Sequence, residues 1–574
     1  MRAASLVVLV ALALPLALGQ FWAYQLGLYA LYAIAAIGVG LCWGEAGFLP
    51  LGQALFFGLA AYLSGFAFIG FADSPALSVI AMPFIALAAG LLAYGIGVVV
   101  FHRTGQSGAY FSMITLALSL LAFQVATSWS SVTGGFDGLK DIPGLPGLDD
   151  ISDVYYVAAA VLLVMIAVTG WLYRAPIGVL WRAGAQNERR LALLGFNVNQ
   201  LKAVAFGFSG FLAGVGGAIY APQQGIVTPQ LVGFGLSADL VIWAAVGGRS
   251  SLLGPVIGTL VVGSLSAQLR DSVPFWEVLM ALFFIVVVLA FPQGIVGVTA
   301  PLWLWFEGRS KIRPPIAAPR SLAEQAPAAL ALSGIRVRVG EVVILDDLSL
   351  DFAQAGIFCV IGPNGAGKTS MFNVVSGELA AAAGRIEFAG SEIGDLAPHR
   401  VTRLGLARKL QIPSVFPALS IGDNLAIALW SRSAGWLQLF DPRLRRWTSP
   451  MLEELRARYP FLAAADRAAG ELSHGEQQIL ELAMALLTEP RVLLLDEPCA
   501  GLSSEETTAV IDIIRWAAER LGGAIIVIEH DMSLVKELAE TVYVLHNGSL
   551  LAQGSVAAIQ ANPAVRAVYV GGEK

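Results

Sequence analysis

Long apolar runs recur through the first half of the chain, and most approach the length needed to cross a hydrocarbon core of about 30 Å. One buried core cannot hold so many runs, so they predict membrane-spanning helices. A shorter apolar piece at 237–246 stops at Gly247-Gly248, as expected of a short or broken membrane helix. We expect nine or ten crossings, from the runs at 3–19, 21–43, 48–71, 76–101, 108–128, 153–173, 201–220, 252–269 and 274–292.

The first of these runs leaves two interpretations open. Residues 6–18 resemble the apolar region of a signal peptide, and 17–19 have the small residues of a cleavage site. The same run is also long enough to remain in the protein as a membrane helix. We favour the retained helix.

The pattern changes near Arg309, where charged residues, Pro and Ala replace the apolar runs. Only ten of the 35 Lys and Arg residues precede this point, and charged residues make up 13% of the chain, against about one quarter in soluble domains. We therefore expect a membrane domain at 1–308, a linker at 309–328 and a soluble domain at 329–574.

The soluble part alternates strand-like runs with helical patterns, which is typical of an α/β domain with parallel strands. The clearest runs are 358–361, 492–495 and 524–528. The predicted fold is therefore multi-domain, with a polytopic α-helical membrane domain followed by an α/β domain.

The loops between the apolar runs indicate how the chain crosses the membrane. The loop at 174–202 has five basic residues and one acid, which places it in the cytoplasm by the positive-inside rule. The loop at 129–153 has five acids and one basic residue, and lies one crossing away, outside. With ten crossings of the inner (plasma) membrane, the N-terminus and the soluble domain are both cytoplasmic.

Charge and cysteine content narrow the classes of protein. A net charge of −6 without a long basic run gives no reason to expect nucleic acid as a partner. Cys42, Cys359 and Cys499 are isolated, so neither a cysteine metal site nor a disulfide framework is predicted. A lone cysteine such as Cys499 is typically a small packing residue, and we assign it no role.

A glycine-rich segment predicts a phosphate-binding loop. Residues 362–369 fit G-x-x-x-x-G-K-[ST], between a strand ending at Ile361 and a helical pattern from Ser370. The glycines let backbone N–H groups approach the phosphates of ATP, Lys368 reaches the β and γ phosphates, and the Thr369 hydroxyl can ligate Mg²⁺. The expected ATP-binding residues are Gly362, Pro363, Asn364, Gly365, Ala366, Gly367, Lys368, Thr369 and Ser370.

An acidic pair supplies the second half of the predicted site. The apolar run 492–495 ends in Asp496 and Glu497, with one carboxylate directed toward Mg²⁺ and the next toward an attacking water. Taken alone, two acids after an apolar strand are usually an exposed strand end. Paired with the loop at 362–369, they indicate nucleotide hydrolysis.

Residues 472–478, Leu-Ser-His-Gly-Glu-Gln-Gln, resemble the signature sequence of the ATP-binding cassette (ABC) family and precede Asp496 as they do in that family. The resemblance covers 329–574. It implies that two cassettes close face to face, with each ATP between the phosphate loop of one and Ser473 and Gly475 of the other.

The same resemblance implies roles for further residues. Gln411 matches the glutamine that touches Mg²⁺ and the permease, and Thr369 with Asp496 would hold the metal. Glu497 and His530 are the expected catalytic residues, Glu497 on the water and His530 on the γ phosphate.

The chain departs from the family pattern at three positions. Val339 stands where many relatives have an aromatic residue that stacks on adenine, His474 replaces a signature glycine, and Ser503 replaces a frequent aspartate. Stacking on adenine is therefore not expected of Val339, whereas the phosphate chemistry is unaffected.

The membrane half resembles the inner-membrane permeases of the branched-chain amino acid and urea type of ABC importer. In that family the segment matching 181–199 is the coupling helix, which docks on the cassette near the residues after Gln411. Its basic residues are also suited to anchoring at lipid headgroups, and both roles stay open. The matching stretches are 44–53, 174–196, 213–220 and 239–254.

Within this type, several short sequence segments resemble urea or short-amide systems more closely than amino-acid systems. We therefore predict a permease-ATPase fusion that imports a small polar solute, urea or a short amide. The alternatives are a branched-chain amino acid importer and an ATP-gated or regulatory membrane protein. These segments are 241–243, 408–416, 472–478, 500–503 and 544–549.

One permease and one cassette are half of what this mechanism needs. We expect a second permease and a second ATPase subunit, as a heteromer because the halves of such importers are commonly different proteins, with a homodimer as the alternative. An extracytoplasmic substrate-binding protein and membrane lipid are the other expected partners. ATP and Mg²⁺ are the expected cofactors.

Overall fold

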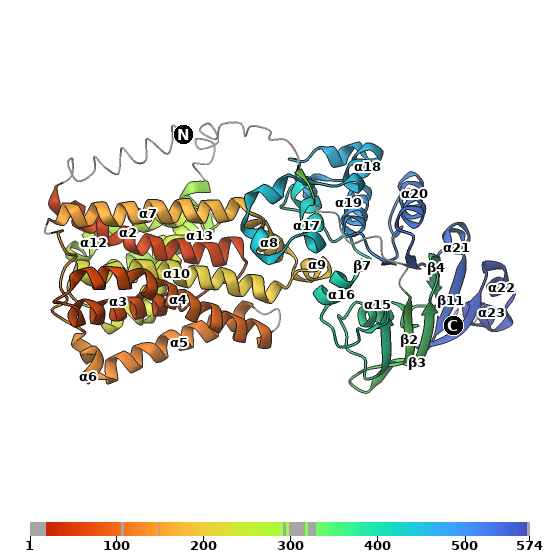
Figure 1. Cartoon of the computed structure of the whole chain (residues 1–574), viewed down its shortest axis with the longest axis horizontal. Helices are drawn as coiled ribbons and strands as arrows, with labels where there is room; N and C mark the ends of the chain where they lie inside the picture. The colour runs from red at the N-terminus through yellow and green to blue at the C-terminus, as the bar shows by residue number, and fades with distance from the viewer. Residues whose placement is uncertain are drawn as a thin grey trace. The chain divides into compact units, whose positions relative to one another are not determined.

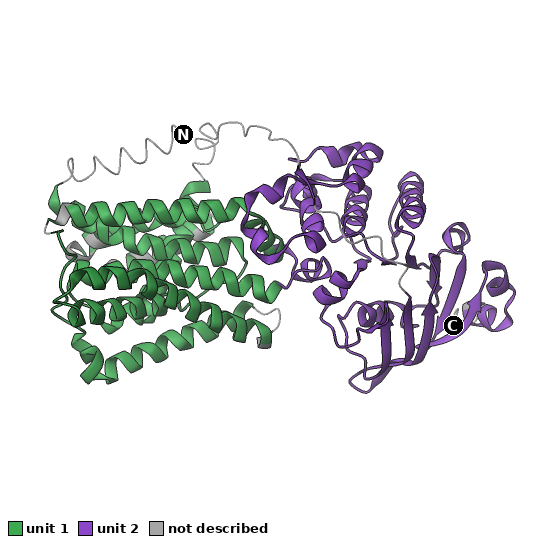
Figure 2. Ribbon diagram, viewed as in Figure 1, with its two compact units in different colours: residues 1–185, 198–312 green, residues 186–197, 313–574 purple. Residues whose placement is uncertain are grey.

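The computed structural model describes residues 19–104, 108–148, 150–290, 294–297, 316–318 and 329–570. Its two compact units are shown in Figure 2. The first, which we call the helical unit, comprises Met1–Ala185 and Val198–Ile312; the second, the α/β unit, comprises Gln186–Asn197 and Arg313–Lys574. A short segment from the loop at 174–202 therefore belongs to the α/β unit.

The helical unit confirms the prediction of a region of long apolar α-helices. Within the described ranges, six helices are long and apolar enough to cross a membrane. They are α2 (Gln20–Gly40, continued by the π-helical turn η1, Leu41–Glu45), α3 (Gln53–Gly70), α4 (Pro75–Thr104), α5 (Gly108–Ser128), α7 (Ile151–Arg174) and α10 (Val198–Gln224).

The expected count of nine or ten crossings is higher than these six. The run at 3–19, with its choice between signal peptide and helix, lies outside the described residues. The runs at 237–246, 252–269 and 274–292 do form helices, but their apolar parts are shorter than 18 residues. They are α11 (Phe234–Gly247), α12 (Gly254–Ser272) and α13 (Trp276–Ala290).

Helix α10 packs against α2, α3 and α4 (Figure 1). Lipid chains are as apolar as the helices, so association depends on close packing, which small residues permit. A Cβ added at Gly217 would lie 1.9 Å from the backbone oxygen of Phe57, and one at Gly210 would lie 2.4 Å from the Cβ of Ala93. The glycines of α10 are therefore sites of helix contact.

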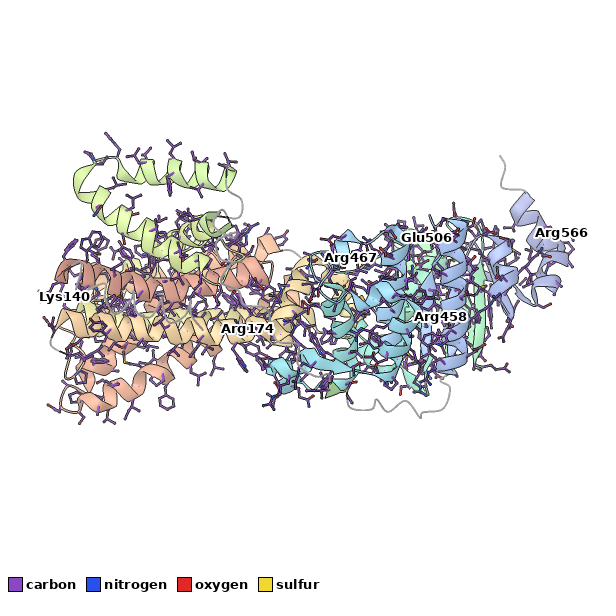
Figure 3. The ribbon with its side chains drawn as sticks, turned by 90° about the horizontal axis from the view of Figure 1, so that it is seen from above. Lys140, Arg174, Arg458, Arg467, Glu506 and Arg566 are labelled. Atoms are coloured by element: carbon purple, nitrogen blue, oxygen red, sulfur yellow. The ribbon has the colours of Figure 1, made fainter. Side chains whose placement is uncertain are left out.

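The two loops of opposite charge lie at opposite ends of the helical unit. Figure 3 shows Lys140 at one end and Arg174 at the other. Near the second end, Arg182 on α8 (Pro176–Gln186) pairs with Glu45 across 3.1 Å, and the Glu45 residue is only 5% exposed. This arrangement agrees with loops on the two sides of a membrane.

The α/β unit confirms the predicted parallel sheet. Its six strands have the order β12-β11-β4-β10-β9-β7, in which β12 alone is antiparallel to its neighbour. The strands are β4 (Gly356–Ile361), β7 (Leu406–Lys409), β9 (Val492–Asp496), β10 (Ala524–Ile528), β11 (Thr541–His546) and β12 (Ser549–Gly554).

A second sheet, with the order β3-β2-β5-β6, is antiparallel and contributes to the same apolar core. Its strands are β2 (Leu330–Val339), β3 (Val342–Phe352), β5 (Ala383–Phe388) and β6 (Ser391–Glu392). Within the expected linker, β1 (Ile316–Ala317) pairs with β8 (Trp447–Thr448).

Helices follow or flank these strands (Figure 1). They are α9 (Glu188–Leu193), α15 (Lys368–Val375), α16 (Pro398–Leu404), α17 (Ile421–Ser433), α18 (Pro450–Arg458), α19 (His474–Leu487), α20 (Ser504–Leu521), α21 (Met532–Leu538), α22 (Val556–Ala561) and α23 (Pro563–Val570).

The register of the sheet sets where the loops meet. Ile528, the last residue of β10, lies opposite Val360 of β4 and Asp496 of β9. Because parallel strands direct their carboxyl ends to one edge, the segments that follow all three strands gather there.

We expect Gly217→Val to destabilise the helical unit, because the added atoms would meet the backbone of α3. The cost should be about 2 kcal/mol or more. Gly95→Val is the matched control, since a Cβ at Gly95 meets nothing within 4 Å. Thermal unfolding of the purified protein in detergent measures both variants. A wild-type melting temperature for Gly217→Val would contradict this packing.

Candidate active site

The glycine-rich loop joins β4 to α15 at the edge where the strands end. Gly367 has φ +95° in the left-handed region, and a Cβ there would lie 2.6 Å from Leu345 Cδ2. Glycine is therefore required for both its conformation and its small size. The turn leaves Asn364 and Gly365 exposed, as a loop that approaches phosphate must be.

Lys368, the first residue of α15, reaches back across this loop. Its Nζ donates hydrogen bonds to the backbone oxygens of Gly362, at 2.7 Å, and Pro363, at 3.1 Å. Burial lowers the pKa of Lys368, and the nearby Glu497 and Asp496 oppose that shift. The ammonium group is thus held where the loop begins, in reach of a phosphate bound by the loop.

Asp496 and Glu497 leave β9 in different environments. Asp496 is buried, and its Oδ2 accepts a hydrogen bond of 3.4 Å from Arg408. Burial raises the pKa of Asp496, whereas Arg408 opposes that rise. Glu497 has φ +43°, which is strained for a residue with a side chain, and its N–H donates to Ile528. The strained turn separates the two carboxylates.

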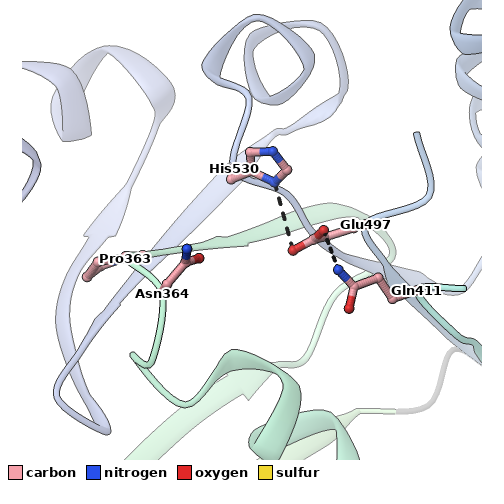
Figure 4. Close-up of a pocket in the computed structure, with 6 residues that line it drawn as sticks. Pro363, Asn364, Gln411, Glu497 and His530 are labelled. Carbon is pink, nitrogen blue, oxygen red and sulfur yellow. Dashed lines mark hydrogen bonds and ion pairs between the residues drawn. The ribbon is translucent and has the colours of Figure 1, made fainter. Parts of the chain in front are cut away.

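Glu497 lies in a pocket between two side chains from other segments (Figure 4). Gln411 Nε2 donates to Glu497 Oε2 at 2.8 Å, and His530 Nδ1 lies 3.8 Å from Glu497 Oε1. Both oxygens of the carboxylate therefore face a polar neighbour. The pocket is lined by Gly362, Pro363, Asn364, Gln411, Glu497 and His530.

The signature residues do not line this pocket. Ser473 is the N-cap of α19: its hydroxyl accepts from the Glu476 N–H, and Glu476 accepts from the Ser473 N–H at 2.9 Å. The backbone N–H of Gly475 faces the carboxylate of Glu506. The structure thus brings the loop, Gln411, Glu497 and His530 together, and leaves Ser473 and Gly475 at a separate helix end.

The expected Mg²⁺ ligands suit a hard cation, which prefers oxygen ligands. Oδ1 of Asp496 is buried and has no hydrogen-bond partner among the described residues, so it is available to a metal. Thr369 and Gln411 are exposed and offer a hydroxyl and an amide oxygen. In the described ranges, His, Cys, Asp and Glu form no group of three that could hold a metal. Mg²⁺ is commonly held by one or two carboxylates together with phosphate oxygens of the substrate.

The three departures from the family pattern have simple structural settings. Val339 ends β2 and is 54% exposed. His474 is the first residue of α19. Ser503 is the N-cap of α20 and accepts from the Glu506 N–H, so serine caps this helix as an aspartate would.

Sequence reasoning missed Arg408, which contacts Asp496. Arg408 and Lys409 are consecutive cations in β7, a strand whose four residues are all buried. Two cations in a buried strand are unusual unless they are paired. That pattern, just before Gln411, is the signal that could have identified them.

These features define an ATPase site of the P-loop class, built on an ABC-type cassette. Comparison with known proteins finds a matching family for each half of the chain. Residues 345–500 match the family described as "ABC transporter", and residues 22–290 match the family described as "Branched-chain amino acid transport system / permease component".

Individual relatives match the cassette half. The "High-affinity branched-chain amino acid transport ATP-binding protein LivG" of Salmonella typhimurium is 33% identical over 248 residues, which are 42% of this chain and 97% of LivG. The corresponding BraF of Pseudomonas aeruginosa is 33% identical over 252 residues, with the same coverage. The crystal structure of the ADP conformation of MJ1267, an ATP-binding cassette of an ABC transporter, has 28% identity and a TM-score of 0.37, and the match covers 42% of this chain and 99% of that one.

The chain belongs to the ABC transporter family, as a fusion of a permease of the branched-chain amino acid transport type with an ABC ATPase. It is a P-loop ATP hydrolase coupled to transport. It is a multi-pass inner-membrane protein with a cytoplasmic ATPase. The predicted class of enzyme and its location are thereby confirmed.

We expect Glu497→Gln to bind ATP but to lose steady hydrolysis by about 100-fold or more, because the amide keeps the shape but loses the carboxylate that orients water. ATP titration calorimetry and phosphate release measure the two properties. Glu505→Gln, an exposed position on α20, is the control and should hydrolyse ATP normally. Near-normal turnover of Glu497→Gln would remove Glu497 from this role.

Lys368→Ala should weaken ATP binding itself, by about 10-fold or more, because a charged hydrogen-bond donor to the phosphates is removed. Titration with a non-hydrolysable ATP analogue measures the affinity. Lys536→Ala, an exposed position on α21, is the control. Equal affinities for the two variants would count against the predicted contact.

Proposed function

We propose that this protein is the permease-ATPase subunit of an importer that takes up branched-chain amino acids. The observation that carries the proposal is the permease match over 22–290, because the permease half forms the path of the solute. The names of LivG and BraF, which match the cassette, point to the same solutes. The comparisons give no support to the predicted preference for urea or short amides, so the alternative replaces it.

The proposed hydrolysis uses the groups that meet in the pocket. Lys368 and the loop amides bind the β and γ phosphates, and Glu497 orients and polarises the attacking water. Gln411 and His530 lie on the two sides of the Glu497 carboxylate and hold it in place. His530 would also contact the γ phosphate of bound ATP. Mg²⁺, held by Thr369, Gln411 and Asp496, would neutralise charge on the phosphates when bound.

The position of the signature supports the need for a second cassette. Ser473 and Gly475 do not line the pocket of their own cassette. A nucleotide on a partner would replace their present contacts with Glu476 and Glu506. The proposed assembly has two permeases, two cassettes and an extracytoplasmic binding protein. We favour a heteromer over a homodimer. Closure of two cassettes on ATP and reopening after hydrolysis would drive the permeases.

The arrangement around Glu497 also bears on the ATP-gated alternative. A cassette that only senses ATP has no need of a carboxylate between Gln411 and His530. The presence of all three groups in one pocket supports sustained turnover.

Uptake by cells that have this transporter as their only route should therefore be high for labelled leucine and low for labelled urea. A site shaped for an aliphatic amino acid makes little apolar contact with urea. With urea bound, the polar groups of the site that pair with an amino acid would stay unpaired. Excess isoleucine or valine should compete with leucine, whereas excess acetamide should not.

Cells with the Glu497→Gln variant are the control, because they keep the permease but lose the hydrolysis that drives uptake. Strong uptake of urea without uptake of leucine would reverse the proposed choice of substrate. The ATPase assignment would stand, since it depends on the α/β unit alone.

A further inference from the structure

Arg190 is a fully buried cation in the α/β unit, although it comes from the loop between two membrane helices. It lies on the short helix α9, in the segment Gln186–Asn197. Removing a guanidinium from water is costly, so such a residue must be paired and hydrogen-bonded. Its partners identify what it does.

Arg190 contacts α19 and β7 together. Its Nη1 lies 3.2 Å from Glu481 Oε1 and donates to the backbone oxygen of Arg408 at 3.0 Å, while Nη2 donates to the backbone oxygen of Glu481 at 3.2 Å. Glu481 is also fully buried. A planar guanidinium with several donors can bridge these groups at once, which a lysine cannot.

Glu481 connects Arg190 to the residues next to the ATP site. The oxygen that faces Arg190 also accepts the N–H of Leu410 at 3.2 Å, and the other oxygen lies 3.9 Å from Lys409 Nζ. Gln411, the residue directly after Leu410, donates a hydrogen bond to Glu497. Arg190 and Glu481 thus hold the backbone on the N-terminal side of Gln411 at two points, the Arg408 oxygen and the Leu410 N–H.

The charges around this point also depend on the loop. Arg408 pairs with Asp496 at 3.4 Å and with Glu378 at 2.8 Å, and Arg189 donates to Glu378 at 2.8 Å. Four cations therefore face three carboxylates, and without the two loop arginines two cations would face three carboxylates. The two loop arginines therefore change the net charge of this group of side chains from −1 to +1. The cations are Arg189, Arg190, Arg408 and Lys409, and the carboxylates are Glu378, Glu481 and Asp496.

The segment is also held by contacts that do not involve Glu481 or β7. Thr402 donates to the Leu193 oxygen at 3.1 Å, and Arg403 donates to the Gly195 oxygen at 2.9 Å. Asn187 donates to Ser414 at 2.9 Å. Docking of the segment therefore has several supports, whereas the contacts with Glu481 and the Arg408 backbone are made by Arg190.

We propose that Arg190 is a positioning residue for ATP hydrolysis, which acts through Glu481 and the end of β7 to hold Gln411 against Glu497. This inference rests on the proposed roles of Gln411 and Glu497. Loss of Arg190 would release the backbone that leads to Gln411 at the Arg408 oxygen. Binding of ATP depends on the loop at 362–369 and is unaffected.

The test compares Arg190→Gln with Arg403→Gln in the purified full-length transporter. Arg403→Gln is matched, because it removes an arginine that contacts the same segment without contacting Glu481 or β7. Arg190→Gln should lower kcat about 10-fold or more and leave KM for ATP within about twofold, since a small misplacement of a catalytic group is costly. Arg403→Gln should keep both values near those of the wild type.

A charge-conserving variant separates positioning from folding. Arg190→Gln alone leaves Glu481 buried without its arginine, so it should also lower the melting temperature. Arg190→Lys keeps a cation beside Glu481 and should recover much of the melting temperature, yet kcat should stay low because a lysine does not bridge Glu481 and the Arg408 oxygen at once. Recovery of kcat together with the melting temperature would show a purely structural role and overturn the proposal.

Other outcomes also decide the question. A kcat for Arg190→Gln equal to that of Arg403→Gln, or a raised KM with unchanged kcat, would overturn it. Normal turnover of Glu497→Gln would instead reject the proposed hydrolytic site, and a wrong choice of imported solute would change none of these ATPase measurements. Failure of this inference is therefore distinguishable from failure of the proposed function.

Discussion

The common edge at which the parallel strands end is the constraint on which the ATP site depends. Residues far apart in the chain meet there because β10 lies between β4 and β9, with Ile528 opposite both Val360 and Asp496. Apart from Asp496 at the end of β9, the residues of β9 and β10 are apolar and buried, as are most residues of β4, so the hydrophobic effect holds the register that aligns their ends. Most polar groups of the site lie at the ends of the strands or in the segments that follow them, where side chains and backbone amides can face a nucleotide.

The α/β unit also contains charges that a stable core would avoid. Arg190, Lys409 and Glu481 are completely buried, and burial lowers the pKa of Arg190 while Glu481 opposes that change. Such groups are tolerated only as a paired set, and a buried pair often adds little net stability compared with apolar residues of similar size. Their placement between the membrane loop and Gln411 suits a role in transport better than a role in stability.

The helical unit follows different physics. Without a hydrophobic driving force between helices, close contact depends on small residues such as Gly210 and Gly217. Glu45, a buried acid of this unit, is paired with Arg182. Within the described residues, six helices are long and apolar enough to cross a membrane. A run of apolar residues does not by itself show where its helix begins or ends. The segments at 237–246 and 274–292 are helical, but short for a full crossing.

The sequence by itself determined the class of the protein and its two-part organisation, and it predicted most of the groups that meet at the candidate ATP site. Those features are contiguous: residues 362–369 must form one loop for the glycines and Lys368 to meet a phosphate, and Asp496 directly precedes Glu497. Only the tertiary structure decided that Arg190 meets Glu481, 291 residues away, and that Arg408 meets Asp496. Local chemistry can be recognised in a short stretch of sequence, whereas a buried ion pair exists only where folding brings two distant residues together and removes both from water.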